Sequence, residues 1–118
     1  GLAGMIARSK ANLAAVSAWV EKSDWASFLA ADPAVRSSTS ICISASDPWF
    51  DGLSEDERRA AMKQIDTLLE AEGVAFDING YRDAPAGLRI WGGATVETAD
   101  IEALLPWLDW AYARAKAA

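Results

Sequence analysis

The 118-residue sequence predicts an α/β fold: a two-layer sandwich in which a small, mainly antiparallel sheet of about four strands carries helices on one face. Three observations support this prediction. Apolar residues recur at helical spacing near both ends and in the middle of the chain, and one segment between them alternates apolar and small polar residues. The expected order is helix, short strand, strand, helix, two strands, helix. The length fits one domain with one hydrophobic core.

The first expected element is an amphipathic helix over residues 3–22. Its apolar positions, set among Ala, Lys, Arg and Glu, are Leu2, Ile6, Leu13, Val16 and Val20. The pattern is already under way at the first residue, Gly1, and no Met precedes it. We therefore expect the chain to be part of a longer polypeptide.

Two strands are expected next. Residues 24–30 form a short edge strand, and residues 39–45 form the clearest strand of the chain. In the second strand Thr39, Ile41, Ile43 and Ala45 share one face, while Ser40, Cys42 and Ser44 share the other. Cys42 is expected to be buried and chemically inert. As the single cysteine it cannot form an internal disulfide, so the fold does not depend on oxidation.

The central helix has clear signals at both ends. Asp47-Pro48 and Asp51-Gly52 indicate a loop, and Ser54 with Glu57 then forms a capping box. The helix should run to about Glu72, with Gly73 as a left-handed C-terminal cap. Its buried stripe is Ala61, Ile65, Leu68 and Leu69.

Two more strands and a final helix are expected in the rest of the chain. Residues 74–78 are expected to form a strand, residues 79–87 a loop and residues 88–91 a last strand, in which Arg89 and Trp91 face away from the core. Thr98 is expected to cap the final helix, and Pro106 should kink it.

Composition excludes several classes of function. A net charge of −6 argues against binding to nucleic acid or to an anionic membrane surface. The chain has no histidine, so it lacks an imidazole for general-base catalysis or for a metal site, and one cysteine alone makes a zinc site very improbable. Neighbouring carboxylates fall at helix ends, where they act as capping or solvated charges. We expect no catalytic residue and no metal ligand in this chain.

Two arginines are the candidate binding residues. Arg82 and Arg89 flank the turn Pro85-Ala86-Gly87, and a guanidinium can meet a carboxylate or phosphate with two parallel hydrogen bonds. Arg89 should project from the outward face of its strand, toward an anionic ligand. Spacing alone favours a different interpretation, in which each is a surface arginine paired with a nearby Asp or Glu such as Asp83.

The four lysines are expected to be solvated charges. Lys10, Lys22, Lys63 and Lys116 all fall on polar faces or ends of the expected helices.

Residues 80–93, which read GYRDAPAGLRIWGG, and residues 106–110, which read PWLDW, resemble the phosphoserine aminotransferases, a family in the class V group of pyridoxal-phosphate enzymes. The resemblance covers most of the chain. It implies that residues 1–118 are the C-terminal small domain, with the large domain that carries the pyridoxal phosphate absent. That cofactor needs a lysine fixed in a pocket, a setting that none of the four lysines has, so we expect no cofactor in this chain. The resemblance also implies that Arg89 holds the substrate α-carboxylate and that Arg82 lies near the substrate phosphate. A better-known branch of the family has His where this chain has Tyr81, and a shorter link between the two arginines.

The resemblance further implies what the whole enzyme does. It transfers an amino group between glutamate and 3-phosphohydroxypyruvate, giving phosphoserine and 2-oxoglutarate, for serine and in many bacteria also pyridoxine biosynthesis. Its partners are the chain's own large domain and a second subunit of a homodimer, in the cytoplasm, and the piece alone is inactive. Two alternatives stay open: another class V aminotransferase, or a free-standing regulatory module that binds small anions through Arg82 and Arg89.

Overall fold

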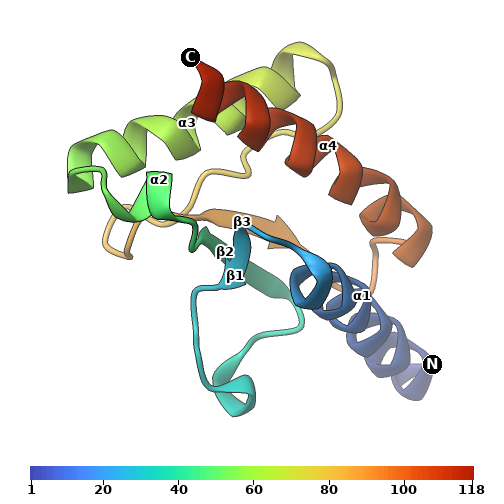
Figure 1. Ribbon diagram of the computed structural model, residues 1–118. Helices are drawn as coiled ribbons and strands as arrows, with labels where there is room; N and C mark the ends of the chain where they lie inside the picture. Colours follow the sequence, from blue (N-terminus) through green and yellow to red (C-terminus); the bar gives the residue numbers. More distant parts are fainter.

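The computed structural model describes residues 1–118 and confirms the α/β class. Figure 1 shows α3 and α4 over one side of a small sheet, with α1 packed beside α4. The elements in chain order are α1 (Leu2–Lys22), β1 (Ala26–Phe28), the 3₁₀ helix η1 (Pro33–Val35), β2 (Ser40–Ala45), α2 (Pro48–Asp51), α3 (Glu55–Ala71), β3 (Leu88–Trp91) and α4 (Thr98–Ala117).

The sheet has three antiparallel strands in the order β1-β2-β3, one fewer than expected. The missing strand is the one expected at residues 74–78. The backbone N–H groups of Val74 and Ala75 both donate to the Leu69 carbonyl, so they complete the end of α3. Asp77 then adopts a φ of 54°, which interrupts an extended backbone. Only an isolated bridge between Asn79 and Leu88 remains.

The two faces of the sheet differ as the alternation predicts. The core-facing side chains of the two longer strands are Ile41, Ile43, Ala45, Leu88 and Ile90, all buried. The outward side chains are Ser40, Cys42, Ser44, Arg89 and Trp91, all at least partly exposed. Cys42 is therefore only half-buried, because it lies on the outward face rather than in the core.

The ends of α3 confirm both signals read from the sequence. The Ser54 hydroxyl accepts from the Glu57 N–H at 3.2 Å, and the Glu57 carboxylate accepts from the Ser54 N–H at 3.0 Å, which completes the capping box. Gly73 follows the helix with a φ of 68°. Leu68, expected in the buried stripe, is only partly buried, and Met62 lies in the core instead.

Two expectations about helix starts were wrong. Residues 48–51 form a short helix, α2, rather than a loop, because the Asp47 carboxylate caps it by accepting from the Phe50 N–H at 2.9 Å. Thr98 does not cap α4; it is the first helical residue, after Glu97. Its hydroxyl donates instead to the Asn12 side chain at 2.6 Å. α4 continues through Pro106 without a break in the assigned helix.

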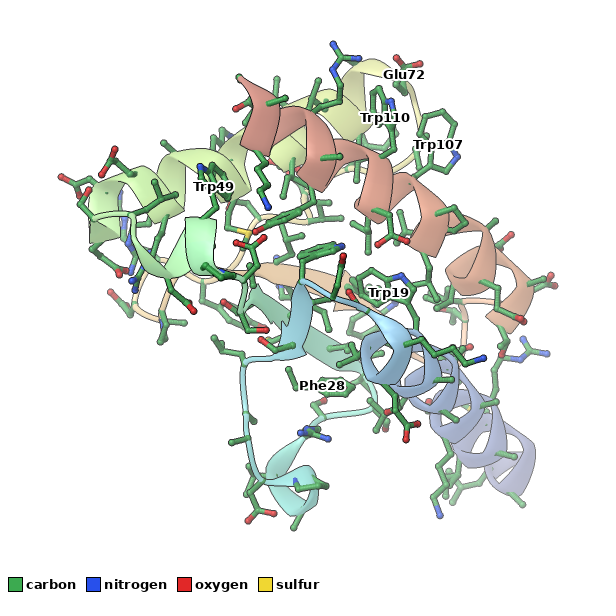
Figure 2. All side chains as sticks on the ribbon, viewed as in Figure 1. Trp19, Phe28, Trp49, Glu72, Trp107 and Trp110 are labelled. Carbon is green, nitrogen blue, oxygen red and sulfur yellow. The ribbon has the colours of Figure 1, made fainter.

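Polar side chains join α1 to the rest of the domain. The fully buried Asn12 donates to the carbonyls of Gly92 and Val96, both at 3.0 Å. The indole N–H groups of Trp19 and Trp25 donate to the two carboxylate oxygens of Asp109 on α4, at 3.1 and 2.8 Å. Figure 2 shows Trp19 in this position between α1 and α4.

No helix of the chain combines the length and apolar character that a membrane span requires.

Candidate functional site

Arg89 projects from the middle of β3 on the outward face of the sheet. In the antiparallel register it lies directly opposite Cys42 of β2, and Trp91 lies opposite Ser40. Its strand neighbours Leu88 and Ile90 point into the core. The side chain of Arg89 is therefore held by β3 where the sequence pattern placed it.

The guanidinium of Arg89 has no acidic partner. No carboxylate oxygen lies within 4.0 Å of it, so the pairing with a nearby Asp or Glu that spacing alone favoured does not form. Its contacts are with Tyr81: Nη1 donates to the Tyr81 hydroxyl at 3.5 Å, and Cζ lies 4.7 Å from the centre of the ring. Its Nε is buried and has no hydrogen-bond acceptor. The domain alone leaves this cation incompletely satisfied.

Tyr81 is itself anchored to the sheet. Its hydroxyl lies 3.1 Å from the Ser40 hydroxyl at the start of β2. The hydrogen bond with Ser40, and then the one from Arg89, lower the pKa of Tyr81 below its ordinary value of 10.0. The ring is half exposed, at 50%. Residues from two strands and one turn thus meet around the guanidinium.

The turn at residues 80–87 places Tyr81 through close backbone contacts. The Gly80 N–H donates to the Gly87 carbonyl at 3.1 Å, and the Arg89 N–H donates to the Ile78 carbonyl at 2.7 Å. A Cβ at Gly87 would lie 2.6 Å from the Ile43 carbonyl oxygen, so only glycine allows this approach to β2. The hydroxyl of Ser44 also ties the turn to β2 by donating to the Ala86 carbonyl at 3.0 Å.

A groove of about 500 Å³ lies beside Tyr81 on the same side of the sheet. Ser40 and Cys42 contribute to its wall, and most of its other lining residues are apolar. Arg36, at its far side, is held in place: its guanidinium donates to the Ala30 and Ala31 carbonyls and lies 4.0 Å from the centre of the Phe28 ring. Phe28 lies between the sheet and the loop that carries η1 (Figure 2). Arg36 therefore stabilises this loop.

Arg82 does not line the same hollow as Arg89. It is exposed on the turn and lines a small hollow of about 190 Å³ together with Arg59 of α3. It forms no hydrogen bond or ion pair within the chain, whereas Arg59 pairs with Glu55 at 3.1 Å and donates to the Ala84 carbonyl at 2.7 Å. Arg89 lines a different hollow, of about 580 Å³, together with Trp91 and residues between α3 and β3 such as Phe76.

Sequence reasoning missed Tyr81 and Ser40 as parts of the site. Tyr81 stands next to Arg82 in the most distinctive segment of the chain, and Ser40 belongs to the outward face of its strand. Neither fact reveals that Tyr81 reaches Arg89 or that Ser40 reaches Tyr81, because these contacts depend on the pairing of β2 with β3 and on the path of the turn.

Exposed apolar side chains lie next to this site. Trp91, on the outward face of β3, is 59% exposed, and it lines a groove of about 460 Å³ with Leu2, Met5 and Ile6 from the first turns of α1. Such contiguous apolar exposure is typical of a surface that another protein part covers. The groove borders the face that carries Arg89.

The four lysines lie on the helices. Lys63 and Lys116 lie on helix surfaces near Asp66 and Asp47, at 3.7 and 3.5 Å. Lys10 and Lys22 are exposed on α1. No lysine lines the groove beside Tyr81 or the hollow that Arg89 lines, whereas Lys10 lines the groove that contains Trp91.

A second cluster of ionisable groups is structural. The buried Asp47 carboxylate caps α2, accepts from the Tyr112 hydroxyl and pairs with Lys116. Burial raises the pKa of Asp47, but the hydrogen bonds from Tyr112 and Phe50 and the charge of Lys116 outweigh this effect and hold that pKa below its ordinary value. Burial, and then Asp47, raise the pKa of Tyr112. Trp25 stacks on Tyr112 with ring centres 4.0 Å apart, which joins β1 to α4.

The fold and the site together define an α/β sandwich domain with an arginine that has no acidic partner on the outward face of its sheet. Comparison with known proteins identifies its relatives. The chain is 46% identical over 112 residues to a phosphoserine aminotransferase of Methanosarcina mazei, and 46% identical over 112 residues to one of Methanosarcina barkeri.

Both matches cover 95% of this chain but 28% of the length of the relatives. The chain is thus homologous to one part of phosphoserine aminotransferases, as the resemblance in residues 80–93 and 106–110 implies. No family model matches the chain.

Proposed function

We propose that this chain is the C-terminal small domain of a phosphoserine aminotransferase, and that Arg89 holds the α-carboxylate of its substrates. One observation carries this proposal: the Arg89 guanidinium projects from the open face of the sheet with no acidic partner and with an unpaired Nε. The homology to two phosphoserine aminotransferases over 95% of the chain supports it.

A carboxylate clamp at Arg89 would serve both halves of an amino transfer. The amino donor and the keto acceptor each carry an α-carboxylate, which a guanidinium can hold through two parallel hydrogen bonds. Holding this group fixes the position of the adjacent carbon, so the clamp contributes to turnover as well as to affinity. We place the cofactor lysine in the remaining polypeptide, because no lysine of this chain lines the hollows beside Arg89 and Tyr81.

The rest of the enzyme would cover the exposed apolar surface. The relatives are longer than this chain, which spans 28% of their length. Trp91 lies on the same face of the sheet as Arg89, and its groove continues to Leu2, Met5 and Ile6 of α1. A large domain packed there would bury this surface and enclose Arg89. We extend the proposal to a cytoplasmic homodimer that acts in serine biosynthesis and also in pyridoxine biosynthesis.

Arg82 is the proposed contact for the substrate phosphate. It has no partner within the chain, and Arg59 adds a second positive charge to its hollow. Because Arg82 and Arg89 line different hollows, the phosphate and the carboxylate would be held by different parts of this domain. Arg82→Ala should then weaken the use of phosphoserine more than that of glutamate. Equal effects on the two substrates would favour another class V aminotransferase without a phosphorylated substrate.

Steady-state kinetics of the complete enzyme test the role of Arg89. Arg89→Ala should raise the KM for phosphoserine and for 2-oxoglutarate by about tenfold or more, because both lose a charged hydrogen-bond donor. Arg89→Lys keeps the charge but loses the planar fork and should recover only part of the affinity. Arg114→Ala, on the far end of α4, is the control and should behave as the parent protein. Normal KM values for both substrates in Arg89→Ala would reject the assignment.

A further inference from the structure

We propose that Tyr81 is a positioning residue for Arg89 and that Ser40 acts through it; this inference rests on the proposed function of Arg89. The three side chains come from separate parts of the sequence and meet on the outward face of the sheet. The Tyr81 hydroxyl contacts both others, at 3.5 Å from Arg89 Nη1 and 3.1 Å from Ser40 Oγ. No other side chain of the domain accepts a hydrogen bond from Arg89.

The ring and the hydroxyl of Tyr81 constrain the guanidinium in different ways. The ring centre lies 4.7 Å from Arg89 Cζ, which fixes the side of the guanidinium that faces the turn. The hydroxyl accepts from Nη1 and so fixes its rotation. An arginine side chain has many rotamers, and fixing one before a ligand arrives lowers the entropy cost of binding.

Ser40 determines where the Tyr81 hydroxyl lies. Tyr81 is half exposed on a turn, and a free ring there could move away from the sheet. The hydrogen bond to Ser40 at the start of β2 ties the hydroxyl to the strand that pairs with β3. Loss of Ser40 should therefore matter only while the Tyr81 hydroxyl is present.

The contacts left unmade on Arg89 show what the ligand supplies. Nε is buried without an acceptor, and no carboxylate of the domain lies within 4.0 Å. A neutral hydroxyl satisfies one N–H and leaves the charge uncompensated. Tyr81 thus orients the guanidinium without neutralising it, as a receptor for an anionic carboxylate requires.

The test is a double-mutant cycle in the complete enzyme, with 2-oxoglutarate and phosphoserine as substrates. Tyr81→Phe keeps the ring and removes the hydroxyl, and it should raise the KM for both substrates by about three- to tenfold while changing kcat less. Ser40→Ala should give a smaller rise in the same direction. The double variant should match Tyr81→Phe alone, because Ser40 acts only through the hydroxyl. Ser27→Ala, on the same face but without contact to Tyr81, is the control.

The outcomes separate this inference from the proposed function. If the parent enzyme shows no aminotransferase activity with phosphoserine and 2-oxoglutarate, the proposed function falls and the inference falls with it. If the parent enzyme is active but Tyr81→Phe has unchanged KM values, the positioning role of Tyr81 is rejected and the proposed function stands. If the effects of Tyr81→Phe and Ser40→Ala simply add, the action of Ser40 through Tyr81 is rejected. Thermal unfolding of each variant, compared with Ser27→Ala, identifies any that loses affinity through misfolding.

Discussion

Cys42 of β2 lies directly opposite Arg89 of β3, so the thiol and the guanidinium project from the same face of the sheet as cross-strand neighbours. Cys42 is half-buried and makes only a weak contact with the Ser40 carbonyl, at 3.8 Å. Its side chain makes no other hydrogen bond, so position 42 offers a way to change the charge next to Arg89 without removing the arginine.

An acidic residue at position 42 should compete with the substrate for Arg89. Cys42→Asp places a carboxylate opposite the guanidinium, and a cross-strand pair of opposite charges is worth up to about 1 kcal/mol, which corresponds to about a fivefold rise in KM for both substrates. Cys42→Asn has nearly the same shape without the charge and should leave KM unchanged. Steady-state kinetics of the complete enzyme give the comparison. Equal effects of Cys42→Asp and Cys42→Asn on KM would show that the shape of the side chain at position 42, and not its charge, affects Arg89.

Ionisation of Tyr81 should weaken substrate binding at alkaline pH. The pKa of Tyr81 is lowered by the hydrogen bonds with Ser40 and Arg89, and the charged or titratable groups that face it are Arg89 and Cys42. Once ionised, the phenolate pairs with the guanidinium and competes with the ligand carboxylate. The KM for 2-oxoglutarate, which does not titrate in this range, should therefore rise as pH increases through the pKa of Tyr81, below 10.0. Tyr81→Phe should lack this rise; the same alkaline limb in Tyr81→Phe would assign it to another group.

Much of this fold could be predicted from the sequence because its signals are local. Alternation assigned the faces of β2 and β3, and the capping box and Gly73 fixed both ends of α3. The prediction of a strand at residues 74–78 was wrong because the backbone there completes the end of α3. Asp77 also takes a left-handed conformation, which a pattern of apolar residues does not reveal. The prediction that Thr98 caps α4 was wrong because its hydroxyl donates to Asn12, which lies 86 residues away in the sequence.

The site was predictable only in part. The outward direction of Arg89 follows from alternation within one strand, and its freedom from acidic partners had to be read from the structure. The contacts of Tyr81 with Arg89 and with Ser40 depend on strand register and on a turn closed by two glycines. Contacts of this kind depend on positions far apart in the sequence, where spacing carries no signal.

Asn12 should be a major determinant of stability. Its side chain is fully buried and satisfies the carbonyls of Gly92 and Val96. Asn12→Leu is similar in size but leaves these acceptors without a donor, so it should lower the free energy of unfolding by about 3 kcal/mol. Ala11→Leu adds the same side chain at a neighbouring exposed position and should change it by less than about 0.5 kcal/mol. Urea unfolding followed by tryptophan fluorescence compares the two. A small effect of Asn12→Leu would mean that the segment after β3 finds other partners.

Asp47 should make the free energy of unfolding of the domain depend on pH in the acidic range. Its carboxylate caps α2 and accepts from Tyr112, and its pKa lies below the ordinary value of 3.8 because these hydrogen bonds and Lys116 outweigh burial. A carboxyl whose pKa is lower in the folded chain stabilises the fold above its unfolded pKa, and this contribution disappears as pH falls through the folded pKa. At pH 7, Asp47→Asn should therefore lower the free energy of unfolding by about 2 kcal/mol, the loss expected for hydrogen bonds to a charged group.

The pH dependence of that difference is the sharper test. Because the protonated Asp47 resembles the amide of Asn, the gap between the parent protein and Asp47→Asn should shrink as pH falls below 3.8. Asp51→Asn, an exposed carboxylate one helical turn later, is the matched control and should show a small gap at every pH. Urea unfolding at a series of pH values gives both curves. A gap for Asp47→Asn that stays constant down to the lowest pH would show that the amide disturbs packing around Tyr112, and that the charge of Asp47 contributes little.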